Sequence, residues 1–239
     1  MNKYIFLLLF IFPTIISCET DYIRGSKNMV KKTFDFVDFT KIDASNTFSV
    51  KLTQGKEYKV ELSCNENILE FIEINQSGET INLDIEGFHS FSNISVKVNI
   101  TVPTIEKIKA SGASKIKMGS FKLDHLEIDL SGASSLKGSL NIVNLLEVEA
   151  SGASTIKLKG KVKNANFDVS GASTINAKNL TINEQLSIDV SGASSCEITS
   201  KGTLEMESSG ASSIEYYGNA KVIKSDESGA GSIEKKYKV

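Results

Sequence analysis

The chain has 239 residues, enough for a sizeable core, with 27 basic and 29 acidic side chains and a formal net charge of −2 at pH 7. This near-balance provides no positive field for a polyanion as large as a nucleic acid, so we expect no nucleic-acid partner. Tryptophan is absent and Arg24 is the sole arginine, which removes the commonest large anchors of binding interfaces.

Residues 1–17 have the pattern of an export signal. Lys3 precedes nine apolar residues, 4–12, which are too few to cross a bilayer as a helix. The sequence Ile15-Ile16-Ser17-Cys18 resembles the lipobox of bacterial lipoproteins, in which the cysteine is lipidated and becomes the mature N-terminus. The alternative is a conventional cleaved signal that ends near a cysteine. We predict that Cys18 carries a palmitate-type anchor and that residues 18–32, which are polar, form a tether.

Residues 33–104 predict an irregular β region. Strands are expected over 50–52, 58–62, 70–75, 80–85 and 94–102, with a short helical turn over 65–69. The segment from Lys41 to Thr47 is a weak copy of the repeat described next, with Asn46 in the place of a glycine. We expect this half either to cover the first coil of the repeats or to continue the same helix, and to share its core.

Residues 105–239 are built on a repeat. The tetrapeptide SGAS begins at Ser111, Ser131, Ser151, Ser170, Ser191 and Ser209, and a variant, SGAG, begins at Ser228. A period near 20 residues predicts stacked coils that share a core. The positions one and three before each first serine are mostly apolar, which is typical of a strand with one buried face.

The tetrapeptide is expected to form a bend in each coil. Glycine would supply backbone angles closed to other residues, alanine would sit inside the corner, and the serines would lie on its rim. Three short strands and three bends per coil predict an all-β parallel solenoid. An antiparallel sandwich is the alternative, but it does not require the same Gly-Ala pair at every corner.

Three rows of outward residues are predicted along the stack. The first row lies two residues before the first serine of each repeat. It holds Lys109 in the first repeat and acidic residues in the others, Asp129, Glu149, Asp168, Asp189, Glu207 and Asp226, and we call it the carboxylate ladder. Four residues after the first serine runs a hydroxyl row: Ser135, Thr155, Thr174, Ser195, Ser213 and Ser232. Six residues after it, Lys117, Lys137 and Lys157 give way to Asn176, Glu197, Glu215 and Glu234.

These rows have two interpretations. They can be a solvated face whose acids pair with lysines elsewhere. Alternatively the C-terminal third, which is acidic in two rows, binds a divalent cation through candidates Asp189, Glu207, Asp226, Glu197 and Glu215. Among aromatic residues, Tyr217 is the candidate for a contact with a partner, because Tyr216 occupies an inward position.

Two further predictions concern the remaining cysteines and the last coil. Cys196 occupies a slot that is aliphatic in the other repeats, so Cys196 and Cys64 are expected to be buried free thiols and not a disulfide. Ser225 and Glu227 stand at inward positions, and the charged run 234–238 follows. We therefore expect a polar last coil that blunts the open sheet edge.

The lipobox, residues 39–55, Lys59-Val60-Glu61 and the SGAS repeats together resemble the bacterial family of auto-transporter adhesins with a head GIN domain, over residues 34–239. This resemblance implies a right-handed, single-stranded parallel β-helix in the envelope of a Gram-negative bacterium. The domain would span residues 33–239, with an irregular β part at 33–104 and the repeats at 105–239. The implied location is the outer membrane or the cell surface.

The favoured function is a lipid-anchored, non-catalytic binding module or adhesin that presents repeated polar faces to a protein or glycan ligand. No clustered acid/base or metal-ligand pattern predicts an enzyme or a cofactor, and His89 and His125 are isolated in the sequence. A structural or assembly protein of the envelope and a carbohydrate-acting enzyme are the alternatives. No oligomeric state is predicted.

Overall fold

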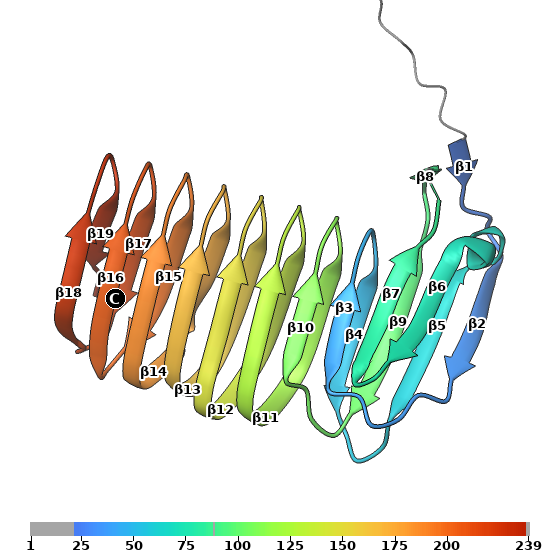
Figure 1. Ribbon diagram of the computed structural model, residues 1–239, viewed down its shortest axis with the longest axis horizontal. Coiled ribbons are helices and arrows are strands. Elements are labelled where there is room, and N and C mark those ends of the chain that lie inside the picture. The colour runs from blue at the N-terminus through green and yellow to red at the C-terminus, as the bar shows by residue number, and fades with distance from the viewer. Residues whose placement is uncertain (1–21, 88, 238–239) are drawn as a thin grey trace, which may run out of the picture.

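The computed structural model describes residues 22–87 and 89–237, and most of them lie in β-strands. Among these residues the one helical element is a short 3-10 helix, η1 (Glu66–Phe71). The predicted lipidation site, Cys18, lies outside the described residues. The repeats form a regular stack (Figure 1), whose strands are β10 (Lys107–Ala110), β11 (Lys115–Leu130), β12 (Ser135–Ala150), β13 (Thr155–Val169), β14 (Thr174–Val190), β15 (Ser195–Ser200), β16 (Thr203–Ser208), β17 (Ser213–Tyr217), β18 (Lys221–Glu227) and β19 (Ser232–Lys235).

The repeats are stacked in parallel and in register. Lys115 of β11 pairs with Ser135 of β12, which pairs with Thr155 of β13, and the same offset of one repeat continues to β19. A stack of parallel neighbours joined through one-repeat crossovers is a solenoid and not a sandwich of hairpins. The predicted all-β parallel solenoid is confirmed.

Each full coil has three sides, but two of its three bends are smooth. In β11 every second side chain is buried as far as Met118, but the next buried residue is Phe121, three positions later. After Leu123 the next buried residue is again three positions later. Register irregularities occur at these two places. The expected three short strands therefore run as one continuous strand with two gentle bends, and the tetrapeptide makes the sharp corner.

The N-terminal region contributes two further coils, but not in sequence order. β3 (Lys41–Ala44) lies between β7 (Thr80–Ile85) and β10, and β4 (Ser49–Gln54) lies between β9 (Val96–Val102) and β11. The corner between β3 and β4 contains Asn46 at φ 60°, whose carbonyl accepts a hydrogen bond from the amide of Ala113. Asn46 thus does replace the glycine of the repeat.

Antiparallel strands close the N-terminal end of the solenoid. β5 (Lys59–Asn65) pairs with β9, β2 (Met29–Phe34) pairs with β5, and β6 (Ile72–Ser77) pairs with β7. In a separate two-stranded sheet, β1 (Tyr22–Arg24) pairs in parallel with β8 (Ser90–Ser92). The prediction of a free tether over 18–32 is therefore wrong from residue 22 onward, because these residues are paired into the fold.

One hydrophobic core runs through both halves, from Phe39 to Ile214. Cys64 and Cys196 lie in it as free thiols, as predicted, and burial raises the pKa of Cys196 to about 12. At the opposite end β18 is exposed along its whole length and carries mostly polar side chains. This agrees with the predicted polar last coil.

Candidate functional site

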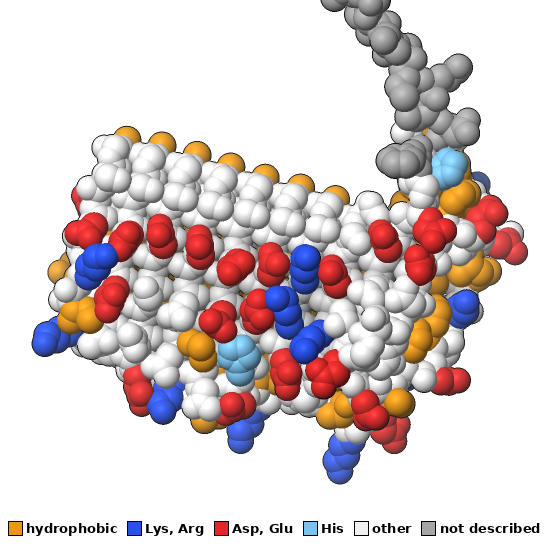
Figure 2. Space-filling view, viewed as in Figure 1, with side chains coloured by type: hydrophobic (Ala, Val, Ile, Leu, Met, Phe, Trp, Pro, Cys, Tyr) orange, Lys and Arg blue, Asp and Glu red, His pale blue; other side chains and the backbone are white. Residues whose placement is uncertain are grey.

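The sharp corner places its side chains differently from the sequence prediction. In every SGAS copy the alanine is exposed, and the second serine is buried. The buried set is Ser114, Ser134, Ser154, Ser173, Ser194 and Ser212, each at most 2% exposed. The exposed alanines belong to the line of small hydrophobic side chains along the corner edge in Figure 2. The placement of alanine inside the corner and of both serines on its rim was wrong.

In three of the corners the buried serine closes the bend through its hydroxyl. Ser154 Oγ donates to the carbonyl of Ser151, three residues earlier, at 2.8 Å, and Ser134 and Ser212 make the same bond to Ser131 and Ser209. Serine hydroxyls commonly satisfy nearby backbone groups in this way. A buried polar side chain costs little when it is bonded, which accounts for serine at these three corners. At Ser173 the buried hydroxyl has no hydrogen-bond partner among the described residues.

The corner glycines are required by both conformation and stacking. Gly152 has φ 69°, and a Cβ atom built on it would lie 2.6 Å from the carbonyl oxygen of Gly132 in the coil before. That carbonyl accepts the amide of Ala153 at 2.7 Å. The stacked corners therefore leave no room for a side chain, and they hold the outward rows on both sides in register.

The carboxylate ladder forms as predicted on the side before the corner. The backbone register aligns Asp43, Lys109, Asp129, Glu149, Asp168, Asp189, Glu207 and Asp226. Figure 2 shows the acids as a line across this face. Asp43 extends the row into the N-terminal coil, which the sequence prediction missed because Asp43 precedes the first SGAS.

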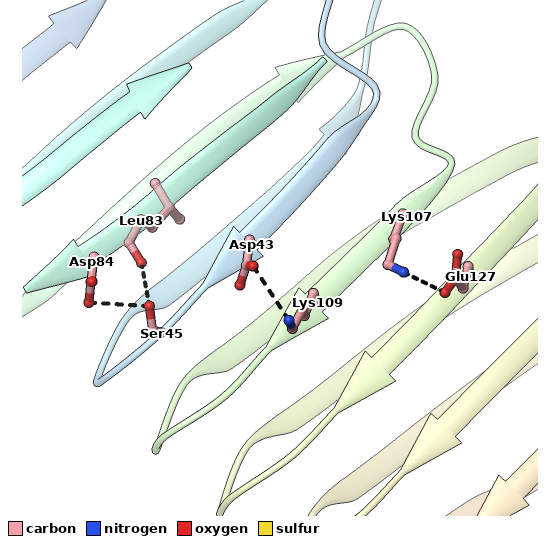
Figure 3. Close-up of polar contacts among 7 residues, drawn as sticks. All are labelled: Asp43, Ser45, Leu83, Asp84, Lys107, Lys109 and Glu127. Atoms are coloured by element: carbon pink, nitrogen blue, oxygen red, sulfur yellow. Dashed lines mark hydrogen bonds and ion pairs between the residues drawn. The ribbon is translucent and has the colours of Figure 1, made fainter. Parts of the chain in front are cut away.

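Lysines interrupt the ladder at its N-terminal end. Lys109 Nζ lies 3.9 Å from Asp43 Oδ2, and in the neighbouring row Lys107 Nζ lies 2.6 Å from Glu127 Oε1 (Figure 3). Ser45, at the next corner, donates to Asp84 Oδ1 at 3.2 Å. Of these contacts, the one between Lys109 and Asp43 lies in the ladder itself and offsets the charge of its first acid, whereas Glu127 and Asp84 lie outside the row. Outside the ladder, His125 Nε2 lies 3.4 Å from Glu147 Oε2, so this histidine has a carboxylate neighbour that its sequence context did not predict.

The C-terminal cation candidates lie in lines and do not surround a common point. Partial burial and the carboxylates of Asp168 and Glu207 raise the pKa of Asp189. Lys224 contacts Glu207 and also lies 3.6 Å from Asp226, and Lys236 lies 3.5 Å from Glu215. Within residues 22–87 and 89–237, no group of three His, Cys, Asp or Glu side chains could hold a metal ion. Lysine is the counter-charge that the structure provides at this end.

On the other side of the corner, the hydroxyl row and the lysine row are aligned in the same way. Lys51, Lys117, Lys137 and Lys157 stack in successive coils, followed by Asn176, Glu197, Glu215 and Glu234. Two surface grooves of about 480 and 540 Å³ lie on either side of the lysines. The sequence prediction identified the lysines of the repeats but not Lys51 or the grooves.

The aromatic contact residue is not where the sequence placed it. Tyr217 is 5% exposed, and its hydroxyl lies 3.4 Å from Glu215 Oε2, whereas Tyr216 is the partly exposed one of the pair. Lys178 Nζ lies 4.4 Å from the centre of the Tyr217 ring. Tyr217 therefore packs as a structural residue and is not available for contact with a partner.

Across the described ranges, no helix has the length and apolar character needed to cross a membrane.

Comparisons with known proteins agree on the architecture. The family described as "Putative auto-transporter adhesin, head GIN domain" matches residues 38–220. A putative adhesin from Bacteroides fragilis has 24% sequence identity and a TM-score of 0.83, covering 90% of this chain and 100% of its own. A putative adhesin from Parabacteroides merdae has 18% identity and a TM-score of 0.70, covering 91% and 100%.

A third solved structure, a putative lipid binding protein from Parabacteroides distasonis, has 15% identity and a TM-score of 0.71, covering 90% of this chain and 100% of its own. No match was found among curated proteins. At these identities the solved structures establish the shared solenoid fold.

Proposed function

Since the chain belongs to the family of putative auto-transporter adhesins with a head GIN domain, we propose that it is a non-catalytic binding module displayed at the bacterial surface. One observation carries this proposal: outward side chains stand in register over successive coils on both sides of the corner edge. Such rows form an extended and rigid surface, which suits contact with a long ligand or another surface. The relatives described as adhesins support the same role.

The anchor would be the lipid on Cys18, which precedes β1 by four residues in the sequence. A cysteine that carries several acyl chains binds a membrane far more strongly than one with a single chain, because each buried methylene contributes about 0.8 kcal/mol. Metabolic labelling with a palmitate analogue tests this part of the proposal. Label should appear on the wild-type chain and be lost in Cys18→Ser, whereas equal labelling of both would contradict lipidation at Cys18.

Binding itself is tested by attachment of cells to mucin-coated glass. Cells that produce the chain are compared with cells that lack it and with cells that produce Cys18→Ser, which would be exported without its anchor. Attachment should fall in both altered strains and return when the wild-type chain is restored. Equal attachment by all strains would contradict an adhesive role on this surface.

A further inference from the structure

We propose that the lysine face of the solenoid binds a linear anionic polysaccharide. The lysine face is the surface formed by Lys51, Lys115, Lys117, Lys137, Lys157 and Lys159 together with the two grooves beside them. This inference rests on the proposed binding function and names its ligand class. The face lies on the opposite side of the corner edge from the carboxylate ladder.

The charges of this face are unbalanced. All six lysines are exposed, and within the described chain none of them has an acidic partner within ion-pair distance. Some stacked lysines on the other side of the corner do have partners: Lys107 pairs with Glu127, and Lys224 with Glu207. Like charges stacked at strand spacing repel one another, so the four lysines of the central row favour an external anion.

The spacing of the charges suits a polymer. Lys51, Lys117, Lys137 and Lys157 are paired in register, so their backbones recur about every 4.8 Å along the solenoid axis. The row spans roughly 15 Å before it reaches Asn176 and the acidic residues Glu197 and Glu215. A chain with regularly repeated anions can contact several lysines at once, and the acids limit its position to the N-terminal coils.

The grooves add hydrogen-bonding groups on both sides of the row. Ser135 and Thr155 line one groove, and Ser139 and Asn179 line the other. Hydroxyl and amide groups both donate and accept hydrogen bonds, which matches the hydroxyl-rich surface of a sugar. Gly119 and Gly138, where the strand bends, also line the second groove. Neither groove has an acidic lining residue.

The same features disfavour other polyanions. Neither groove has an aromatic lining residue on which nucleic-acid bases could stack. The grooves flank the lysine row as recesses, whereas a flat lipid surface would contact a raised basic patch. A carboxylated or sulfated glycan satisfies all of these constraints.

The test measures binding of the full chain, purified in detergent, to polygalacturonate, dextran sulfate and uncharged dextran. The variant Lys117→Gln/Lys137→Gln/Lys157→Gln is compared with Lys31→Gln/Lys56→Gln/Lys221→Gln, which removes the same charge at exposed positions outside both grooves. The wild type and the control variant should bind polygalacturonate or dextran sulfate but not dextran. The variant that lacks Lys117, Lys137 and Lys157, called the groove variant, should bind at least tenfold more weakly. A melting temperature no lower than that of the wild type checks that its fold is intact.

Three results would overturn the inference: equal binding by the two triple variants, no binding of either acidic polysaccharide by the wild type, or tighter binding to phosphatidylglycerol vesicles or duplex DNA than to both polysaccharides. Binding to polygalacturonate alone or to dextran sulfate alone would support it and separate carboxylated from sulfated ligands. The cell-attachment assay is independent of this one. Normal attachment by cells with the groove variant would leave the adhesive role intact and reject the lysine face as its basis.

Discussion

At the scale of the residue, Ala153 and Ser154 show how one corner divides its side chains. The alanine is exposed, whereas the serine is 1% exposed and donates to the carbonyl of Ser151. The periodicity of two already indicates this, because Ser154 has the same parity as the buried Ile156 and Leu158. The chemical character of alanine favoured the opposite placement. Parity along the strand was the more reliable guide, since the strand direction decides which face a side chain joins.

This arrangement predicts opposite outcomes for two neighbouring leucine substitutions. Ala153→Leu should change the free energy of unfolding by no more than about 0.5 kcal/mol, as is usual at exposed positions. Ser154→Leu should lower it by about 1–3 kcal/mol or more, because it overpacks the corner and removes the bond to Ser151. Denaturant unfolding of both variants measures the difference. A larger loss in Ala153→Leu than in Ser154→Leu would contradict the assigned orientation.

The carboxylate ladder predicts a pH-dependent gain of stability in Asp189→Asn. Because the pKa of Asp189 is raised, the folded state binds its proton more readily than the unfolded state does, and ionisation at neutral pH disfavours the fold. The variant should be more stable than wild type at pH 7 by a few tenths to about 1 kcal/mol. The gain should shrink as the pH falls toward the ordinary aspartate value of about 3.9.

The control for this prediction is Glu70→Gln, which neutralises an exposed acid outside the ladder. Urea unfolding at pH 7 and pH 4 gives the change in the free energy of unfolding of each variant relative to wild type at each pH. A loss of stability in Asp189→Asn at pH 7, or an equal gain at both pH values, would show that burial and the neighbouring acids together do not disfavour the ionised form of Asp189.

At the scale of the element, each coil consists of one bent strand and one sharp corner. The two smooth bends occur where the alternation of buried residues skips a position, as after Met118 and after Leu123. These breaks in the alternation cannot be located in the sequence until the pairing between neighbouring strands is known. The sharp corner is different, because glycine marks it directly, and the Asn46 corner could be identified from its weak similarity to the repeat.

The corner glycine predicts a clear difference between two Gly→Ala variants. Both Gly152 and Gly78 have positive φ, but a Cβ at Gly152 would lie 2.6 Å from a backbone oxygen, whereas nothing lies within 4 Å of one at Gly78. Gly78→Ala should lower the free energy of unfolding by about 1–2 kcal/mol, because alanine disfavours the left-handed backbone conformation. Gly152→Ala should lower the free energy of unfolding distinctly more, because the new methyl group would also force the stacked corners apart. Equal losses in thermal or urea unfolding would show that stacking does not constrain the corner.

At the scale of the whole molecule, the repeats predicted the solenoid, its common core and the alignment of its rows. The order of the N-terminal coils could not be predicted. Long-range pairing places β3 between β7 and β10, and β4 between β9 and β11. The pattern of apolar residues in a strand contains no information about which sheet edge the strand will join. Tyr217 was misplaced because the alternation of buried residues breaks in these coils: Tyr217 pairs in register with Thr199, which is buried next to the buried Ile198.

The central claim is that this solenoid faces the outside of the cell, and labelling of intact cells with a membrane-impermeant amine reagent tests it most directly. Lys31, Lys56 and Lys221 are exposed and lie outside both grooves, so a bound ligand on the lysine face would not mask them. Mass spectrometry should find them modified on intact cells to the same extent as after lysis, while a cytoplasmic protein stays unlabelled until lysis. Modification of these lysines only after lysis would contradict surface display and, with it, the adhesive role.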